Sequence, residues 1–359
     1  MKLEYIWLDG HETPGIRSKT RYDVFDFGSE QEPAPLDNVF TQIPEWSFDG
    51  SSTNQADIDS SDLVLRPVRM YPNPMENGRE QISYIVLCEV FGSDGSPHES
   101  NVRYDLREYL NTEDDLGLMT SVEQEYVLWD SIPDWPTGWG WDNKEDEGMH
   151  PEDAGKSYCG IGSGNITQKW VSDSHVQACM RAGIRIAGTN AEVMKSQWEY
   201  QLFPSDPLVC ADSLWISRYI LERIAEQRNI SINYDPKPFK EYNGSGGHIN
   251  FSTRDMREEG GEELFNNIIA ALEENHNKTI ESYGKDNKKR LTGKHETSKY
   301  NKFTSGISDR SASVRIPLDT TRNWKGHIED RRPAANIDPY AALLALCKVV
   351  NSVTAGVLV

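Results

Sequence analysis

Alternating apolar and polar residues predict a strand-rich first part of the chain. Short segments in which every second residue is apolar are typical of strands with one buried face. Four such segments are predicted before residue 92, at residues 3–8, 22–27, 62–68 and 83–91. Between them, Trp46-Ser-Phe-Asp-Gly-Ser-Ser-Thr53 is expected to be a Gly/Ser loop that carries one acid, Asp49. The pattern therefore predicts a small, strand-dominated domain.

Helical spacing begins near residue 100. Val102, Leu106 and Leu110 recur at intervals of four residues and predict a helix over 101–110. Further helices are predicted at residues 173–182, 210–227 and 262–283, and strands alternate with them at residues 185–188 and 248–252. The change of pattern predicts an α+β chain with two domains, residues 1–100 and 101–359.

The segment 118–129 reads as a buried strand that carries two carboxylates. Glu123 and Glu125 are two residues apart, so both side chains point to the same face of the strand. Strand geometry separates them by roughly 6.6 Å. Two anions this close in apolar surroundings repel each other and take up protons unless a cation neutralises them. A divalent metal is one interpretation, and an exposed strand face with both charges in water is the other.

Composition narrows the class of protein. The 359 residues carry a net charge of −20, which argues against nucleic-acid and anionic-membrane partners because both require a basic surface. Five cysteines without a Cys-x-x-Cys pair indicate reduced thiols and a cytoplasmic location. The apolar segment 340–359 has the length of a membrane span. Lys348, Asn351 and Ser352 instead favour a buried terminal helix.

Further acids and one histidine lie in apolar or glycine-rich segments. They are Glu192, Glu199, His248 and Glu329. With Glu123 and Glu125 they make an oxygen-rich donor set, which suits Mg²⁺ or Mn²⁺ better than zinc. The gap between Glu192 and Glu199 requires a bend or loop between them. Taken singly, each residue can also be explained as structural.

Several arginines lie beside small or apolar residues. Arg290, Arg310, Arg315 and Arg331 are in this group. Because arginine binds carboxylate and phosphate oxygens with two hydrogen bonds, arginines near metal-binding acids suit a phosphate-bearing substrate. Surface ion pairs are the alternative. A Walker-type phosphate loop and a Gly-x-Gly-x-x-Gly turn are absent from the sequence, so ATP would be held mainly by metals and arginines. The long segment 132–156 is predicted to form a rim over the site.

Seven ordered motifs resemble glutamine synthetase of the eukaryotic-like type II branch, across nearly the whole chain. The motifs are Trp-Ser-Phe-Asp-Gly-Ser-Ser-Thr, Glu-Gln-Glu-Tyr, Gly-Thr-Asn-Ala-Glu-Val-Met with Gln-Trp-Glu, Asn-Gly-Ser-Gly-Gly-His-Ile-Asn-Phe-Ser, Arg-Leu-Thr-Gly-Lys-His-Glu-Thr, Arg-Ser-Ala-Ser-Val-Arg-Ile-Pro and Glu-Asp-Arg-Arg-Pro. The resemblance implies a β-grasp domain followed by a catalytic domain whose curved antiparallel sheet is flanked by helices. It also implies a homo-oligomeric ring, typically a decamer of two pentamers, with active sites between subunits.

The resemblance also implies a ligand set. One metal, Mg²⁺ or Mn²⁺, would be held by Glu125, Glu192 and Glu199, and the other by Glu123, His248 and Glu329. The substrates would be L-glutamate, ammonium and ATP. L-Glutamate would be bound by Arg290, Arg310 and Arg331 with Glu241, Tyr242, Asn243 and Gly244. The nucleotide would be bound by Glu123, Glu199, Asn250, Ser252, Arg310, Arg315 and His327.

The implied reaction is the ligation of ammonia to the γ-carboxylate of glutamate through γ-glutamyl phosphate. Arg310 would neutralise the transferred phosphoryl group. Asp49 would deprotonate ammonium in the funnel of a neighbouring subunit, and Glu296 would shield the acyl phosphate from water. The ammonium site would comprise Asp49, Ser52, Tyr158, Glu199 and Glu296.

Some positions depart from the family pattern. Met119 replaces an aromatic residue and His327 replaces Tyr or Phe, both where the family sandwiches adenine. Phe203 stands in place of the expected Gly shortly after Glu-Tyr-Gln, and Glu241-Tyr242 replaces Asn-Trp. A γ-glutamyl ligase for another amine and a non-catalytic structural relative are the alternatives. Retention of Asp49, Ser52 and Glu296 favours ammonium, because together they form a small cation site.

Overall fold

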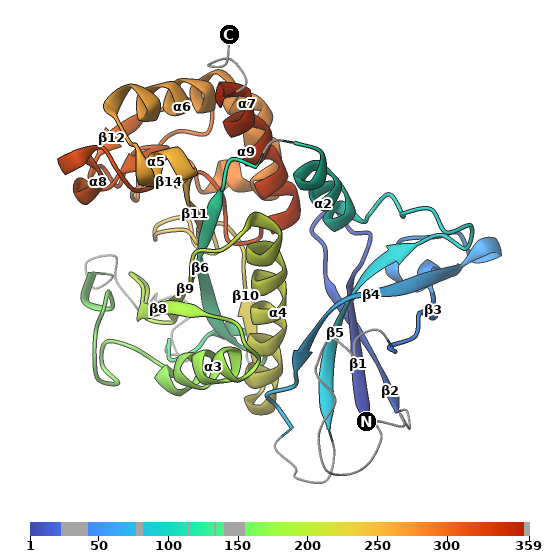
Figure 1. The fold of residues 1–359 in the computed structure, drawn as a ribbon. Helices are drawn as coiled ribbons and strands as arrows, with labels where there is room; N and C mark the ends of the chain where they lie inside the picture. The colour runs from blue at the N-terminus through green and yellow to red at the C-terminus, as the bar shows by residue number, and fades with distance from the viewer. Residues whose placement is uncertain (23–41, 77–81, 114, 133, 140–154, 355–359) are drawn as a thin grey trace, which may run out of the picture.

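The structure is a computed structural model that describes residues 1–22, 42–76, 82–113, 115–132, 134–139 and 155–354. These residues form two sheets (Figure 1). The first has the strand order β2-β1-β5-β4-β3. Its strands are β1 Lys2–Leu8, β2 Ile16–Tyr22, β3 Trp46–Asp49, β4 Asp62–Pro72 and β5 Ser83–Phe91. The parallel pairing of β1 with β5 beside antiparallel β1–β2 and β4–β5 pairs makes this sheet mixed.

The second sheet has nine strands in the described residues, with the order β12-β13-β14-β11-β6-β9-β8, and β7 and β10 also pair with β6. The strands are β6 Met119–Asp130, β7 Trp135–Pro136, β8 Ile186–Ala191, β9 Gln197–Leu202, β10 Ile230–Asn233, β11 Gly247–Ser252, β12 Ser305–Ile307, β13 Val314–Ile316 and β14 Ile328–Asp330. All neighbours are antiparallel except β12 and β13. The two-domain α+β architecture, with a β-grasp sheet followed by a curled sheet and helices, is confirmed.

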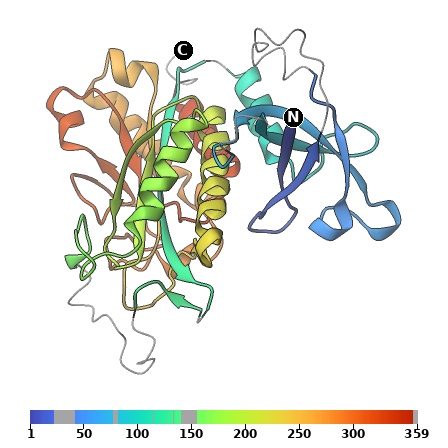
Figure 2. The ribbon, with the colours of Figure 1, turned by 90° about the horizontal axis from the view of Figure 1, so that it is seen from below.

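The helices of the described residues are α2 Val102–Thr112, α3 Lys169–Arg181, α4 Pro207–Ala225, α5 Arg254–Glu258, α6 Glu262–Glu274, α7 His276–Thr279, α8 Leu318–Asn323 and α9 Pro339–Thr354. Of these, α3 and α4 pack on strands of the large sheet. Short 3₁₀ turns occur at Gly50–Thr53, Ile58–Ser60, Glu226–Arg228, Ile280–Ser282 and Asn287–Lys289. Figure 2 shows α3 and α4 side by side between the large sheet and the first sheet. Their apolar residues form one core with β6, β9 and β11.

A buried ion-pair network joins the first sheet to the helices α2, α4 and α9. The Arg103 guanidinium in α2 donates to Glu89 Oε1 of β5 at 2.6 Å and to Asp212 Oδ1 of α4 at 2.8 Å. Tyr340 in α9 donates to the same Asp212 oxygen at 2.7 Å. Because all four side chains are buried, this network satisfies charges that burial would otherwise destabilise.

Several predicted elements are confirmed. The strands at residues 3–8, 62–68 and 83–91 correspond to β1, β4 and β5, and the segment 118–129 corresponds to β6. The predicted helices near residues 101, 173 and 210 correspond to α2, α3 and α4. The terminal segment forms α9, whose apolar side chains pack into the core, and no described helix is long and apolar enough to cross a membrane. The strand predicted at 22–27 and the rim at 132–156 lie largely outside the described residues.

Two predicted elements differ from the structure in part. The segment 262–283 is helical as predicted, but its helix is interrupted at Asn275 and continues as α7 and a 3₁₀ turn to Ser282. The expected loop at residues 46–53 begins as β3, because it pairs with β4, and continues as a 3₁₀ turn that Asp49 caps through the Ser51 amide. The polar strand β2 was not predicted, since an edge strand in partial contact with solvent lacks a clear apolar alternation.

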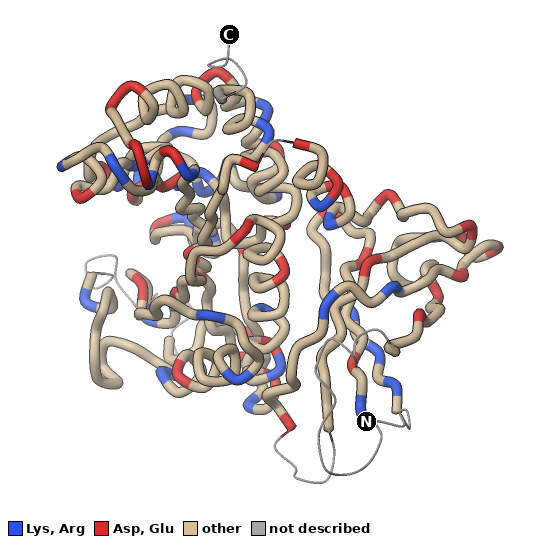
Figure 3. Tube along the Cα trace, in the orientation of Figure 1, with Lys and Arg blue, Asp and Glu red and all other residues tan. Residues whose placement is uncertain are grey.

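Charged residues are spread along the trace in both parts of the molecule (Figure 3). Acidic positions occur on the helices and on the first sheet alike. The excess of acids therefore does not mark one functional face, and the site must be found from buried charges.

Candidate active site

The two carboxylates of β6 point away from the helices. Between them, the Gln124 amide oxygen accepts hydrogen bonds from Arg218 of α4, at 2.9 Å from Nε and 2.6 Å from Nη2. Since strand side chains alternate, Glu123 and Glu125 lie on the opposite face. This is the face on which the other predicted acids gather.

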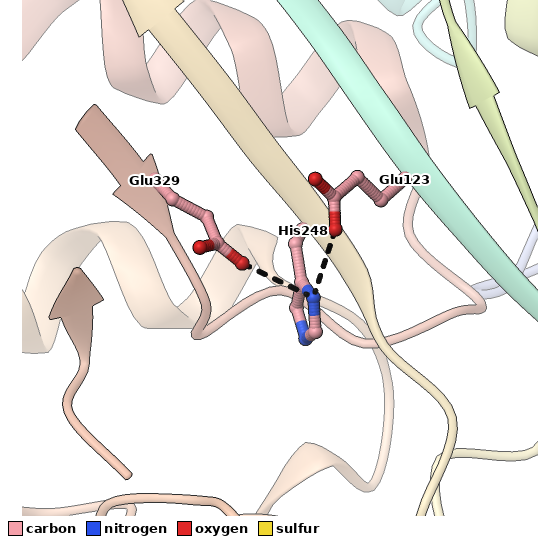
Figure 4. Close-up of side chains that lie close together, drawn as sticks. All are labelled: Glu123, His248 and Glu329. Carbon is pink, nitrogen blue, oxygen red and sulfur yellow. Dashed lines mark ion pairs between the residues drawn. The ribbon is translucent and has the colours of Figure 1, made fainter. Parts of the chain in front are cut away.

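Glu123, His248 and Glu329 meet on this face (Figure 4). Glu123 and His248 are cross-strand partners in β6 and β11, and Glu329 pairs with Asn250 between β14 and β11. His248 Nδ1 lies 3.8 Å from Glu123 Oε2 and 3.6 Å from Glu329 Oε1. Ligand atoms of all three lie within 4.8 Å of one another. Three strands thus converge on a position of the size that a metal ion requires.

Burial keeps His248 neutral. The loss of hydration, together with the Arg331 and Arg290 guanidinium groups, holds the His248 pKa well below its usual value of 6.5. Arg290 Nη2 lies 2.7 Å from His248 Nε2, and Nδ1 faces the two carboxylates. A neutral imidazole is the form that can bind a metal. Gly246 permits this packing, because a Cβ there would lie 2.4 Å from His248 Nε2.

Glu125, Glu192 and Glu199 form a second acidic group. Glu125 and Glu199 are cross-strand partners in β6 and β9, and Glu192 lies in the turn between β8 and β9. The bend predicted between Glu192 and Glu199 is confirmed by this turn. Burial, only partly offset by Arg290, raises the Glu125 pKa to about 7. Burial and then Glu125 raise the Glu192 pKa to about 8. Burial followed by Glu123, Glu125 and Glu192 raises the Glu199 pKa well above 4.5.

These raised pKa values are the physical test of whether a metal fits. Three buried carboxylates in mutual repulsion hold protons only because too little positive charge reaches them. A divalent cation would replace those protons and remove the repulsion. Five carboxylates and one imidazole form a hard, oxygen-rich donor set, which suits Mg²⁺ or Mn²⁺. The residues therefore fit a metal centre.

Arginines surround the first acidic group, which consists of Glu123, His248 and Glu329. Glu329 accepts from Arg331 Nη1 at 2.6 Å and from Arg315 Nη1 at 2.7 Å. Arg290, which is also buried, lies on the other side of His248. Arg310 is exposed and its carbonyl accepts from Arg331 Nε at 3.0 Å. All four predicted arginines therefore lie around one site.

A cavity of about 460 Å³ opens beside Glu123. Four of the seven residues predicted to bind nucleotide line it, namely Glu123, Asn250, Ser252 and His327. Met119 also lines the cavity, and Asn250 Nδ2 donates to Glu123 Oε1 at 2.8 Å. Glu199, Arg310 and Arg315 are not among its lining residues. The cavity therefore adjoins the group formed by Glu123, His248 and Glu329.

The predicted glutamate segment lies against Arg290. A Cβ on Gly244 would lie 2.9 Å from Arg290 Cγ, so only glycine allows this approach. Asn243 is half-buried and Glu241 is exposed. The Tyr242 ring is buried against Trp139 and Phe239. Its ring is therefore part of an aromatic cluster, and its carbonyl accepts from Lys237 Nζ.

The predicted ammonium residues fall into two groups. Burial raises the Tyr158 pKa, the Arg310 charge opposes this rise, and the Glu192 and Glu199 charges add to it, so Tyr158 lies within the electrostatic reach of all three. The Glu296 charge likewise raises the Glu192 pKa. Both His295 and Glu296 have left-handed backbone conformations. Asp49 and Ser52 lie instead at the end of β3, at the edge of the first sheet far from β6 (Figures 1 and 2). A single chain does not bring them to the acids.

Sequence reasoning missed two side-chain amides that donate to the second acidic group. Gln201 Nε2 donates to Glu199 Oε1 at 2.7 Å, and Gln197 Nε2 lies 3.1 Å from Glu125 Oε2. The signal was present in Gln197-Trp-Glu-Tyr-Gln201, because strand periodicity places both glutamines on the face of Glu199.

Comparison with known proteins decides the family. The family model described as glutamine synthetase, catalytic domain, matches residues 100–357, and the one described as glutamine synthetase, beta-Grasp domain, matches residues 1–93. This chain belongs to the glutamine synthetase family. The chain is 44% identical over 339 residues to the glutamine synthetase of Emericella nidulans, covering 94% of this chain and 88% of that protein.

Other members of the glutamine synthetase family are similarly close. The Saccharomyces cerevisiae glutamine synthetase is 40% identical over 348 residues, with 97% of this chain and 88% of that protein covered. Glutamine synthetase PR-2 of Phaseolus vulgaris is 40% identical over 340 residues, with 94% and 90% covered. A cryo-EM structure of Plasmodium falciparum glutamine synthetase, 18% identical, superposes with a TM-score of 0.74 over 99% of this chain and 72% of that chain. This last similarity supports the fold.

The buried acids give a testable pH dependence. Without metal, we expect the melting temperature to fall as the pH rises from about 6.5 to about 8. Glu125 and Glu192 keep protons to pKa values of about 7 and 8 when folded but to 4.5 when unfolded, so the folded state binds more protons and loses stability with rising pH. His248 is neutral over this range when folded and about half protonated at pH 6.5 when unfolded, so above about pH 7 it opposes the fall only slightly.

Thermal unfolding of EDTA-treated protein checks this pH dependence. Adding Mg²⁺ should make the fall smaller, because the cation replaces the protons. Glu192→Gln should flatten the metal-free curve. A metal-free melting temperature that rises with pH over this range contradicts the assignment of raised pKa values.

Proposed function

We propose that this chain is an ATP-dependent glutamate–ammonia ligase, which converts L-glutamate, ammonia and ATP to L-glutamine, ADP and phosphate. The observation that carries the proposal is the arrangement of acids on both sides of the Glu123/Glu125 pair. Glu123 belongs to a group that adjoins the 460 Å³ cavity, and Glu125 to a group that adjoins Arg290 and Gly244. Phosphoryl donor and acceptor would therefore bind next to each other, on the face of β6 that carries both carboxylates.

Two divalent cations, Mg²⁺ or Mn²⁺, complete the proposed site. Glu125, Glu192 and Glu199 would hold one, and Glu123, His248 and Glu329 would hold the other. When bound, the cations would neutralise phosphoryl oxygens and orient the two substrates. Asn250 would fix Glu123 through its 2.8 Å hydrogen bond, and Gln201 would fix Glu199 through its 2.7 Å bond.

The first step would be phosphoryl transfer. An oxygen of the glutamate γ-carboxylate attacks the γ-phosphorus of ATP, the bond to the β-phosphate oxygen breaks, and ADP leaves. Arg310 and Arg315 would neutralise the charge that spreads over the transferred group. Arg290 and Arg331, with Glu241 and the main chain of residues 242–244, would hold glutamate in line. Asn250, Ser252 and His327 would hold the nucleotide in the cavity next to Glu123.

The second step would be amide formation. Ammonium would bind at Tyr158, Ser52, Glu199 and Glu296 and lose a proton to Asp49. Ammonia then attacks the γ-carbonyl carbon, phosphate leaves with the C–O bond electrons, and the attacking nitrogen loses a further proton to the departing phosphate, which leaves the neutral amide. Hydrogen bonds from Ser51 and Ser52 lower the Asp49 pKa, so Asp49 is ionised in the isolated chain. Glu296, on the strained 295–296 turn, would exclude water from the acyl phosphate.

The position of Asp49 in the fold supports a homo-oligomer. Asp49 and Ser52 lie at a distant edge of the same chain, so they would serve the active site of a neighbouring subunit. A ring, and in particular a decamer of two pentamers, has the closed symmetry that places every such loop in a neighbouring site. We further propose a domain boundary near residue 100 and a cytoplasmic location, which the unpaired Cys88, Cys159, Cys179, Cys210 and Cys347 support.

Phosphate release from ATP and glutamate with Mg²⁺ tests the reaction. We expect turnover to depend on ammonium and to yield glutamine, with methylamine and polyamines giving little or none, because Ser52, Tyr158 and Glu296 leave room for a small cation. Preference for methylamine or a polyamine would indicate a different γ-glutamyl ligase. The lack of turnover with every amine would indicate a non-catalytic relative.

A further inference from the structure

The amide of Gln197, which the proposed mechanism does not use, lies where two functional segments meet. Gln197 is the first residue of β9 and is buried. Its Nε2 lies 3.1 Å from each of three acceptors, Glu125 Oε2, Gly244 O and Ser245 Oγ. Its Oε1 accepts from the Met194 amide at 3.4 Å, which orients the side chain. One buried amide thus connects the second acidic group with the segment that faces Arg290.

On the acidic side, Gln197 fixes the rotation of the Glu125 carboxylate. Oε2 accepts from Gln197 Nε2 and from the Gly246 amide at 2.9 Å. Oε1 has no hydrogen-bond partner among the described residues. With one oxygen held by two donors, the other is left on the face that Glu125 shares with its cross-strand partner Glu199. Amide donors also stabilise a charged carboxylate, which is the form that binds metal.

On the other side, Gln197 fixes the 244–246 segment. The Gly244 carbonyl accepts from Nε2, the Ser245 amide donates to the Pro236 carbonyl at 3.0 Å, and the Ala335 amide donates to the Ser245 carbonyl at 2.9 Å. Gly244 packs directly on the Arg290 side chain. A shift of the Gln197 amide would therefore move Glu125 and the contact surface of Arg290 together.

We propose that Gln197 is a positioning residue that sets the distance between the Glu125 metal ligand and the glutamate-binding segment 243–246. This inference rests on the proposed function, since it assigns Gln197 to the glutamate half of that site. Only a side chain with two donors at this length can donate to both Glu125 Oε2 and the Gly244 carbonyl. Glutamate would place a like charge 3.1 Å from Glu125 Oε2, and methionine would remove the donors at similar length.

Two substitutions and one control test this inference. Gln197→Met should weaken Mn²⁺ binding at one of two sites by about 10- to 100-fold, as measured by calorimetry without substrates. The KM for glutamate should rise over the same range, while the KM for ATP changes less than about twofold. Gln197→Glu should give an effect at least as large. Gln227→Met makes the same change on an exposed glutamine outside the site and should leave all three values unchanged.

The outcomes separate this inference from the proposed function. A lower melting temperature with unchanged Mn²⁺ binding and unchanged KM for glutamate would show a merely structural role and overturn the inference. An equal rise in the KM for glutamate and the KM for ATP would also overturn the inference. If Gln197→Met does not fold, the isosteric Gln197→Glu is judged by the same criteria. If the unsubstituted protein makes no glutamine, the proposed function fails, while Mn²⁺ binding still judges the role of Gln197.

Discussion

Replacing Glu329 with Gln is expected to lower glutamine synthesis by roughly a thousandfold. Glu329 is buried, faces His248 Nδ1 at 3.6 Å and accepts hydrogen bonds from both Arg315 and Arg331. A neutral amide removes the proposed metal ligand and leaves two arginines without their carboxylate. Loss of the buried pairing should also lower the free energy of unfolding by about 3 kcal/mol. Steady-state kinetics and urea unfolding measure the two effects separately.

A matched control is the exposed Glu258 at the end of α5, where the same change should alter neither value. Kinetics must be measured where the Glu329→Gln protein is fully folded, so that a loss of activity reports on chemistry. Activity within tenfold of the unsubstituted protein under those conditions would remove Glu329 from the proposed metal site.

Replacing Asp49 with Ala should lower glutamine formation by roughly a thousandfold while ATP binding is retained, because a lost general base affects only ammonium deprotonation. Asp49 is exposed in the isolated chain and bonds Ser51 and Ser52. Asp49→Asn can keep the Ser51 contacts through its amide oxygen and can donate to Ser52 Oγ from its amide nitrogen, so a similar loss there would show that the charge, and not the turn, is required. Its cross-strand partner supplies the control, as Asp62→Asn should be nearly neutral.

Mixed oligomers of Asp49→Ala and Glu329→Gln subunits test where Asp49 acts. If Asp49 serves a neighbour, random mixing should restore up to about a quarter of the activity, since one site in four pairs an intact Glu329 with an intact Asp49. No restoration on mixing would place Asp49 in its own subunit's chemistry or outside the mechanism. An unchanged rate in the Asp49→Ala protein alone would exclude it as the base.

Local patterns were reliable where an element is long and has one clear buried face. β5, β6 and α4 were predicted from apolar periodicity because their burial follows it. β12, β13 and β14 have only three residues each, which is too short for periodicity to indicate a strand. β2 was missed because its residues are polar and its place is decided by pairing with β1. The interruption at Asn275 has no signal in the apolar periodicity of the segment.

The same division holds for the site. Each acid could be picked out from its own segment, since a charge in an apolar or glycine-rich run needs an explanation. The groups of acids depend on strand register, which aligns Glu123 with His248 and Glu125 with Glu199. A slip of one residue in either pairing would turn these side chains to opposite faces. Gln197 and Gln201 gained significance only when their hydrogen-bond partners were known.

The sequence by itself determined the two-part α+β organisation, the candidate acids and arginines, and the resemblance to the glutamine synthetase family, because composition, periodicity and ordered motifs are properties of local segments. The tertiary structure alone decided that the acids form two groups on either side of the Glu123/Glu125 pair, that Gln197 joins Glu125 to the 244–246 segment, and that Asp49 lies away from both groups. The physical reason is that these relations join residues far apart in the chain, and only strand pairing and packing fix the distances between them.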